Sequence, residues 1–281
     1  MKLSVIVPIG DFRMYERCRA SLQVAIAPLK DAVELIEVDD TAHRGVDWAR
    51  NEGLRRAKGE YVAWVDSDDE VTADWASEIL KACESRPDVV QYSVVMHWVD
   101  CMSRQDTVVS CLRGGDIDPH EFAVNIIGGY RSAWLWSCVF RQSLLQDVII
   151  YGRYYEDYRL FCEVLPRVCK VYGIAKVIYR YNRRINGLSH YGMPEEARDA
   201  VKRIVDGTER MSGRWRRYRQ RATAQMCADL CWNGVGNGWC RLHMLRHCLT
   251  VLLDVGITVR VKIKYVVSLL GVRVNLKGCR Q

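Results

Sequence analysis

The sequence predicts an α/β protein with a doubly wound sheet, and two observations support this prediction. Apolar runs at residues 3–8, 34–38 and 61–65 have the length and composition of buried strands. Helical patterns over residues 15–27 and 48–57 separate these runs. An alternation of strand and helix is typical of sheets whose strands are joined by crossover helices. We therefore expect the first three strands to lie in one sheet.

Carboxylates follow the second and third expected strands. Asp39 and Asp40 follow the second strand, and Asp66 and Asp68 follow the third. Ligands of open α/β sheets bind at the carboxyl ends of the strands, and extended backbone would direct Asp66 and Asp68 to the same side. Their hard oxygens suit Mn²⁺ or Mg²⁺ whose shell is completed by phosphate oxygens. The alternative is that Asp68 or its neighbour caps a helix beginning near residues 72–75.

The alternation is less regular beyond the third strand. Asp118 is expected to cap a short helix that has Pro119 at its first position. The other expectations are a first strand stopped by Pro8, a helix over 73–85, strand material over 89–99 paired with 107–112, a strand over 134–140, a helix from 154–158 through 167, a strand over 171–181, and helices from 194 onward.

Composition indicates a globular chain. Its 281 residues, 49% of them hydrophobic, can bury a substantial core. The first apolar run is too short for a signal peptide, and no apolar stretch is long enough to span a bilayer. The twelve cysteines are scattered through strand-like and helix-like segments, which favours a reduced, cytoplasmic protein. Cysteines and histidines cluster over 227–248, where free thiols are a better interpretation than structural zinc because no paired CxxC occurs.

Charge divides the chain into an acidic and a basic part. From position 200 onward there are 16 Lys and Arg against 4 Asp and Glu, whereas the first 199 residues hold 25 and 30. One interpretation is that this tail lies on an anionic membrane surface, and the other is a solvated helical face. No recognition motif accompanies the charge, so no nucleic-acid partner is expected. The basic residues concerned are Arg210, Arg214, Arg216, Arg217, Arg219, Arg221, Arg260, Lys262, Lys264, Arg273 and Lys277.

Short motifs occur in a fixed order at residues 4–8, 38–40, 49–54, 57–61 and 65–69. This series resembles glycosyltransferase family 2, whose fold is GT-A, a Rossmann-like mixed sheet flanked by helices. Residues 136–141, 155–157 and 183–190 resemble the acceptor-side and closing segments of that family. The resemblance implies a catalytic domain over 1–191 and a basic helical C-terminal region over 192–281.

The family resemblance also implies a reaction and roles for individual residues. The reaction is inverting transfer of a sugar from a nucleotide-diphosphate donor, with UDP favoured, to a glycan or lipid-linked glycan of a cell-surface polysaccharide. Asp68 would hold Mn²⁺ or Mg²⁺ with Asp66 and His190, and Asp157 would be the base. The protein would act in the cytoplasm or peripherally on the inner face of the cell membrane. The nucleotide-sugar residues would be Pro8, Asp39, Asp40, Arg50, Asp66, Arg183 and Arg184, and the acceptor-side residues Trp136 and Glu156.

Several roles have structural alternatives. Glu156 and Asp157 would suit the start of a helix, and an aromatic pair such as Trp134 and Trp136 suits a core as well as a sugar platform. A degenerate scaffold, a membrane-binding module and a nucleotidyltransferase are the alternative functions. Departures from the family pattern are Gly10 and Asp11 after the first strand, a short connection over 41–48 that suggests a trimmed nucleotide-binding half, and Cys138 at a position that is commonly basic.

Overall fold

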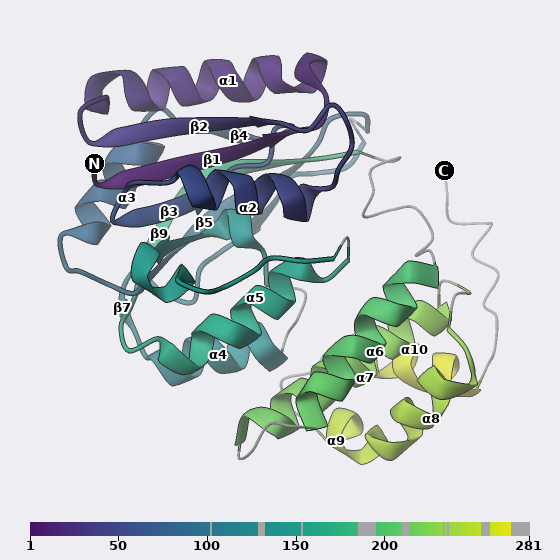
Figure 1. The fold of residues 1–281 in the computed structure, drawn as a ribbon. Helices are drawn as coiled ribbons and strands as arrows, with labels where there is room; N and C mark the ends of the chain where they lie inside the picture. The colour runs from purple at the N-terminus through teal and green to yellow at the C-terminus, as the bar shows by residue number, and fades with distance from the viewer. Residues whose placement is uncertain are drawn as a thin grey trace. The chain divides into compact units, whose positions relative to one another are not determined.

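The computed structural model describes residues 1–101, 103–128, 133–152, 154–184, 195–209, 214–232, 234, 236–253 and 259–270. The chain divides into two compact units (Figure 1). Unit 1 comprises Met1–Ile126 and Arg131–His190, and unit 2 comprises Ile127–Tyr130 and Tyr191–Gln281. His190 and the rest of 185–194 lie outside the described residues, as do Arg210, Arg273 and Lys277.

The described part of unit 1 contains a mixed sheet with the strand order β2-β1-β3-β8-β5-β9-β4. The strand β1 pairs in parallel with both β2 and β3, whereas β8 is antiparallel to β3 and β5. The predicted α/β class, with a mixed sheet flanked by helices, is therefore confirmed. The strands are β1 (Leu3–Ile9), β2 (Val33–Asp39), β3 (Tyr61–Trp64), β4 (Glu70–Val71), β5 (Val89–Trp98), β6 (Thr107–Val109), β7 (Gly115–Ile117), β8 (Cys138–Arg141) and β9 (Val171–Arg183).

Helices cover both faces of this sheet (Figure 1). Odd-numbered residues of β1 share one core with α1 (Phe12–Ile26) and α3 (Trp75–Cys83). The opposite face carries α2 (Val46–Arg56), α4 (Pro119–Gly128) and α5 (Glu156–Val164). There Gly53 of α2 lies so close to β1 that an added Cβ would be 2.2 Å from Ile6 Cγ2, which explains a glycine within a helix. Alternation of side chains along a strand separates the two cores.

Two local expectations were wrong. Pro8 lies inside β1, where it is paired with Val38, and does not end the strand. Proline is tolerated here because its backbone nitrogen faces β3, as the carbonyl of Ile6 does. The pairing of β1 with β3 ends at Ile6 and Trp64, so the missing N–H of Pro8 lies beyond the paired residues. The segment 134–140 is a strand only from Cys138, because residues Leu135–Ser137 form a single 3₁₀ turn. The expected pairing of 107–112 with the 89–99 strand is confirmed by β6 on β5.

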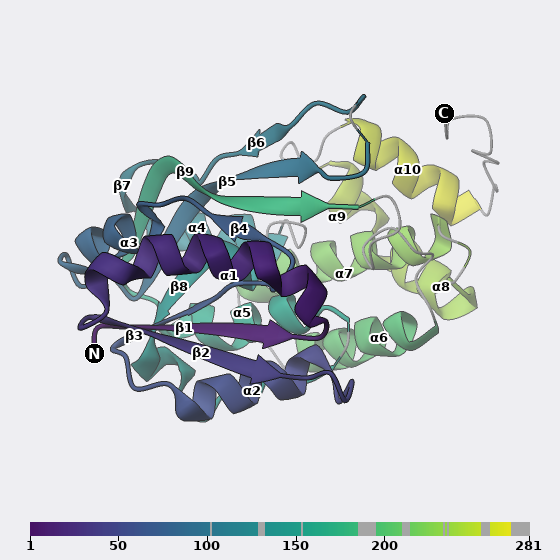
Figure 2. The same cartoon turned by 90° about the horizontal axis from the view of Figure 1, so that it is seen from above.

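The described part of unit 2 is helical, as predicted. Its helices are α6 (Glu195–Glu209), α7 (Arg214–Trp232), α8 (Gly238–Arg246), α9 (Cys248–Leu252) and α10 (Val259–Leu270). Helix α7 contacts the four other helices (Figure 2), and its small buried side chains Ala224 and Ala228 allow close packing. An ion pair of 2.6 Å joins Asp229 of α7 to Lys264 of α10. Among the described residues, no helix combines the length and apolar character needed to cross a bilayer.

The cysteine cluster lies where α7 meets α8. Cys227, Cys231 and Cys240 are free thiols that contact one another, and hydrogen bonds from the first two lower the pKa of Cys240 to about 3. Within the described ranges, no group of three or more His, Cys, Asp or Glu side chains is arranged to hold a metal ion. Cys227 and Cys240 are buried in the core of unit 2.

Candidate active site

The acidic loop between β3 and β4 is anchored by β9. The hydroxyl of Tyr179 donates to Asp69 Oδ2 at 2.7 Å, and the backbone N–H of Asn182 donates to Asp69 Oδ1, also at 2.7 Å. Asp69 is buried, and burial raises its pKa, with the charges of Asp66 and Asp68 acting in the same direction. Neither Asp68 nor Asp69 caps the next helix, because the N-cap of α3 is Asp74. Asp69 therefore serves the fold of the loop.

Asp66 and Asp68 remain accessible in this fixed loop. The backbone N–H of Asp66 donates to the Tyr179 hydroxyl at 3.2 Å, and the Asn182 side chain donates to the carbonyl of Asp68 at 2.9 Å. The two side chains are 26% and 39% exposed. Two carboxylates from one short loop suit a hard divalent cation that takes its other ligands from water and phosphate. The loop therefore fits a metal–diphosphate complex better than a closed protein cage.

Arg50 of α2 contacts three carboxylates that come from two distant segments of the sequence. Its Nη1 donates to Asp157 Oδ1 at 2.6 Å and to Glu156 Oε1 at 2.9 Å, and its Nη2 donates to Asp66 Oδ1 at 3.3 Å. The guanidinium is only 4% exposed. A planar, permanently charged group with several donors is suited to holding carboxylates in this way. Arg50 thus positions the carboxylates, and its predicted contact with a nucleotide stays a prediction.

Burial dominates the acid–base properties of this cluster. It raises the pKa of Glu156 to about 8, and the neighbouring Asp157 charge adds to the effect. It also raises the pKa of Asp157, against the opposing charge of Arg50. For Arg50 burial acts to lower the pKa, but the charges of Asp157, Asp66 and Glu156 outweigh it and raise the pKa. A carboxylate with a raised pKa is a stronger base than an ordinary aspartate.

Asp157 is held from a second side as well. Its Oδ2 accepts from the backbone N–H of Leu135 at 3.2 Å, and Tyr155, just before α5, adopts a left-handed φ of 59°. Non-glycine residues with such a φ are strained and often lie at functional sites. Glu156 and Asp157 lie in the first turn of α5, where a negative charge also suits the helix dipole, and both side chains accept from Arg50.

The carboxylates that follow β2 are bonded within their own turn. Asp40 Oδ1 accepts from the N–H of Arg44 at 2.8 Å, and Asp40 Oδ2 accepts from that of Gly45 at 3.0 Å. Asp39 Oδ1 accepts from the backbone and the side chain of Thr41. In the described sheet β2 is an edge strand. A short connection leads from β2 to α2. The predicted nucleotide contacts of Asp39, Asp40 and Pro8 stay predictions.

Two adjacent arginines at the end of β9 have different environments. Arg184 Nη1 lies 3.6 Å from Asp68 Oδ2, whereas the guanidinium of Arg183 packs over the Trp98 ring at 4.8 Å from its centroid. Neighbouring residues of extended backbone point to opposite sides, so only Arg184 is seen to reach the acidic loop. His190, the third predicted metal ligand, lies outside the described residues.

The predicted acceptor platform is a stack of aromatic rings. Trp136 stacks on Trp134 with centroids 5.1 Å apart and on Tyr181 at 4.9 Å. Trp136 is only 4% exposed and belongs to the core of unit 1, while Trp134 is half-buried. Trp134 is consequently the member of the predicted pair that is accessible to a ligand.

Residues 24–105 match the family described as Glycosyl transferase family 2. This segment contains Asp40, Arg50, Asp66 and Asp68, the same residues whose order suggested the family. Over this segment the chain is similar to glycosyltransferase family 2.

Two curated relatives are named as glycosyltransferases. The putative glycosyltransferase EpsH of Bacillus subtilis is 23% identical over an alignment that covers 37% of this chain and 30% of EpsH. The glucosyl-dolichyl phosphate glucuronosyltransferase of Haloferax volcanii is 25% identical, with 35% of this chain and 40% of that protein covered. The chain thus spans less than half the length of either relative.

Solved structures show the same fold over nearly the whole chain. Residues 1–349 of S. aureus TarS in complex with UDP superpose with a TM-score of 0.60 at 18% identity, covering 94% of this chain and 91% of that one. The complex of TarS with UDP-GlcNAc gives a TM-score of 0.59 at 18% identity, with coverages of 96% and 82%. These similarities confirm the GT-A-type architecture predicted from the family 2 resemblance.

The candidate site includes residues that sequence reasoning missed. Tyr179 and Asn182 fix the acidic loop from β9, and the Leu135 backbone holds Asp157. The sequence signal that could have pointed to Tyr179 is the presence of polar and aromatic residues in the segment predicted as a strand. A backbone N–H carries no signal in a sequence. Of the residues predicted for the site, the structure brings together Arg50, Asp66, Asp68, Glu156, Asp157 and Arg184.

Proposed function

We propose that the protein is an inverting glycosyltransferase that moves a sugar from a nucleotide-diphosphate donor to a hydroxyl of a glycan or lipid-linked glycan. The observation that supports this most is the meeting of Asp66 and Asp157 at Arg50. It brings a carboxylate of the predicted donor loop and the predicted base to one guanidinium. A donor bound at Asp66 and an acceptor hydroxyl bound at Asp157 would therefore lie close to each other.

In this proposal Asp157 takes the proton of the acceptor hydroxyl. The hydroxyl oxygen forms a bond to the anomeric carbon of the donor while the bond from that carbon to the diphosphate breaks. The electron pair of the broken bond leaves with the nucleoside diphosphate. A single displacement from the opposite face inverts the anomeric configuration. Each carboxylate oxygen has two lone pairs, so Asp157 can bind Arg50 and Leu135 and still accept this proton.

The charge of the departing diphosphate requires stabilisation. Asp66 and Asp68 would hold Mn²⁺ or Mg²⁺, which supplies Lewis-acid stabilisation of developing negative charge when bound. Arg184, beside Asp68, would contribute a guanidinium to the same oxygens. Burial raises the pKa of Asp68, with the Asp66 charge adding to it and Arg184 opposing it. The two carboxylates therefore repel each other unless a cation lies between them.

A UDP-sugar is the donor that the comparisons support best. TarS has been crystallised with UDP and with UDP-GlcNAc, and it shares the fold of this chain. The lipid-linked acceptor in the name of the Haloferax enzyme supports a lipid-linked glycan as the acceptor.

The proposed transfer is tested with UDP-GlcNAc as a probe, by following the release of UDP. Asp157→Asn should lower the rate about 10²- to 10⁴-fold, while UDP binds as it does to the wild type. Asp31→Asn, an exposed aspartate of unit 1, is the matched control and should be unaffected. Full activity in Asp157→Asn would refute the base assignment. Absence of UDP binding in the wild type would favour a degenerate scaffold.

A second proposal concerns unit 2, which we infer lies on the inner face of an anionic membrane. Helices α8 and α9 present a row of leucines that are between 50% and 75% exposed, flanked by the exposed Arg241 and Arg246. The row consists of Leu242, Leu245, Leu249 and Leu253. Their spacing places them on one side of the helices, and a basic helix with an apolar stripe is typical of a lipid surface.

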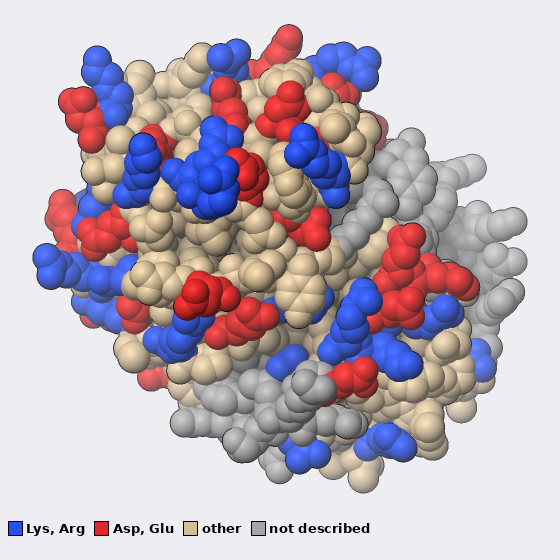
Figure 3. All heavy atoms as spheres, in the orientation of Figure 1, with Lys and Arg blue, Asp and Glu red and all other residues tan. Residues whose placement is uncertain are grey.

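Surface charge adds detail to this second proposal. On the face seen in Figure 3, blue and red side chains are interspersed among the described residues. The proposed membrane contact consists of the leucine row and its two arginines. Flotation with phosphatidylcholine vesicles, with and without phosphatidylglycerol, should show salt-sensitive binding to the anionic vesicles only. Binding should be lost in Leu249→Glu and retained in Val24→Glu, an exposed control on α1. Equal flotation of both variants would overturn the proposal.

A further inference from the structure

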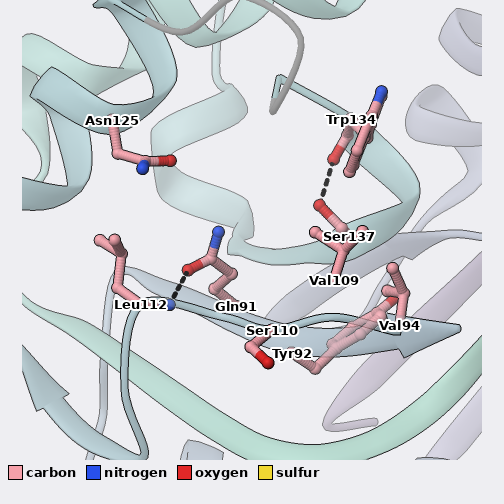
Figure 4. A pocket seen from close by; sticks show the side chains of 9 residues that line it. All are labelled: Gln91, Tyr92, Val94, Val109, Ser110, Leu112, Asn125, Trp134 and Ser137. Carbon is pink, nitrogen blue, oxygen red and sulfur yellow. Dashed lines mark hydrogen bonds between the residues drawn. The ribbon is translucent and has the colours of Figure 1, made fainter. Parts of the chain in front are cut away.

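Unit 1 contains a cavity of about 80 Å³ beside the tryptophan stack (Figure 4). Strand β5 and the segment after β6 form one wall, α4 contributes another, and the 3₁₀ turn closes it. Its polar and aromatic lining consists of Gln91, Tyr92, Ser110, Asn125, Trp134 and Ser137. Since one water needs about 10–15 Å³ of such volume, the cavity can hold about five to eight water-sized groups. This is room for a sugar substituent and the edge of its ring.

The chemistry of the cavity is neutral. Among the described residues that line it, none is charged, so a phosphate or carboxylate would enter without a counter-charge. Burying an unpaired charge is far more costly than burying a hydrogen-bonded neutral group. The polar and aromatic groups of the lining are two carboxamides, two serine hydroxyls, a phenol and an indole. Amides and hydroxyls match sugar hydroxyls, and an aromatic face matches the C–H face of a ring.

The orientation of Gln91 gives the cavity a directed donor. Its Oε1 accepts from the backbone N–H of Leu112 at 3.3 Å, which assigns the oxygen and the nitrogen of the carboxamide. In Figure 4 the nitrogen points away from Leu112, into the space between Asn125 and Ser137. Ser137 Oγ donates to the Trp134 carbonyl at 2.8 Å, so its lone pairs remain as acceptors. The cavity thus offers donors and acceptors together.

The cavity is tied to the proposed base by the 3₁₀ turn. Trp134 and Ser137 line the cavity, and the N–H of Leu135 between them donates to Asp157 Oδ2 at 3.2 Å. Residue Gln91 of β5 is paired with Cys138, directly after the turn. A group in the cavity is therefore held at a fixed position relative to Asp157.

We infer that this cavity binds a neutral part of the acceptor saccharide, such as an acetamido or hydroxymethyl group, and so selects uncharged acceptors. The inference rests on the proposed glycosyl transfer, because it assigns the acceptor of that reaction. Trp134 packs against the ring, and Gln91, Asn125 and Ser137 hydrogen-bond its substituent.

Saturation-transfer NMR in the presence of UDP tests this inference directly. The probes are N-acetylglucosamine, methyl glucoside and glucuronic acid, and the variants are Asn125→Leu and Gln23→Leu. Asn125→Leu removes a carboxamide from the cavity at similar volume, whereas Gln23→Leu makes the same change at an exposed site on α1. UDP signals in every sample report on the donor site and on folding.

A neutral sugar should give a signal with the wild type and with Gln23→Leu. The signal should fall about tenfold with Asn125→Leu, as expected for one lost hydrogen bond in a buried site, and glucuronic acid should give none. Equal signals from glucuronic acid, or a neutral-sugar signal that Asn125→Leu leaves unchanged, would overturn the inference while UDP binding stands. Loss of the UDP signal in the wild type would instead contradict the proposed function.

Discussion

The two acidic groups of unit 1 differ in what surrounds them. In the loop after β3, the Tyr179 hydroxyl accepts from the backbone N–H of Asp66 and donates to Asp69, and the Asn182 side chain donates to the carbonyl of Asp68. The side chains of Asp66 and Asp68 are left partly exposed. At α5, Glu156 and Asp157 are largely buried and share the guanidinium of Arg50. The first arrangement suits a ligand that brings its own cation, and the second suits a proton acceptor. All four residues carry a carboxyl group, so the different suitability of the two groups follows from their burial.

Removing the shared guanidinium should have the largest effect on this comparison. In Arg50→Met three carboxylates lose their common partner, and two of them are buried, which should lower the free energy of unfolding by about 3–5 kcal/mol at pH 7. Chemical denaturation measures the loss. The variant should recover as the pH falls, since protonation removes the unpaired charges. Arg55→Met, which removes an exposed guanidinium from the same helix, should change stability little. A stable Arg50→Met variant would show that the buried group does not depend on Arg50.

The pH dependence of stability should separate the two acidic groups. Burial raises the pKa of Glu156 to about 8, above its value of about 4.5 in an unfolded chain, so folding favours the protonated form. This contribution to stability is complete below pH 4.5 and is lost as the pH rises toward 8.

Glu156→Gln tests this assignment, because the variant has no carboxyl group to titrate. Between pH 5 and pH 8, the free energy of unfolding of this variant should fall by about 3–4 kcal/mol less than that of the wild type. Denaturant titrations at several pH values measure the slope, with Glu60→Gln, whose pKa is lowered by Lys2, as the control. Parallel slopes for wild type and Glu156→Gln would contradict the raised pKa.

Tyr179→Phe should have the smallest effect. The hydroxyl bridges the backbone N–H of Asp66 and the carboxylate of Asp69, and its loss should cost about 1–3 kcal/mol. Thermal unfolding, compared with the exposed control Tyr151→Phe, measures that cost. If the loop also depends on the bridge, the affinity for UDP with Mn²⁺ should fall as well. Unchanged stability and affinity would show that Asn182 alone fixes the loop.

The first three strands and their helices could be predicted because their signals are local. Apolar runs and helical patterns alternate there, and the strand ends are marked by aspartates. The roles of those aspartates could not be separated, because Tyr179 and Asn182 are 110 and 113 residues away from Asp69. Similarly, the turn at Leu135–Ser137 has strand-like composition. Its N–H is bound by Asp157, 22 residues later, and such contacts are absent from a local pattern.

The charge partner of Asp157 was also beyond local reasoning. The expected donation of Arg50 to the nucleotide stays a prediction. The structure places its guanidinium against Glu156 and Asp157, 106 and 107 residues away. These contacts depend on how α2 and α5 lie on the same face of the sheet, which no local pattern in the sequence reports.

The most direct test is a calorimetric titration of UDP, GDP and CDP, each with and without Mn²⁺, into wild type, Asp68→Ala and the exposed control Asp31→Ala. The proposed site predicts metal-dependent binding of UDP by the wild type and by Asp31→Ala. It also predicts a loss of at least about tenfold in affinity with Asp68→Ala, as for removal of a charged ligand to a metal–diphosphate complex. Binding that is independent of Mn²⁺ and of Asp68, or no binding of any nucleotide, would contradict the account of the acidic loop.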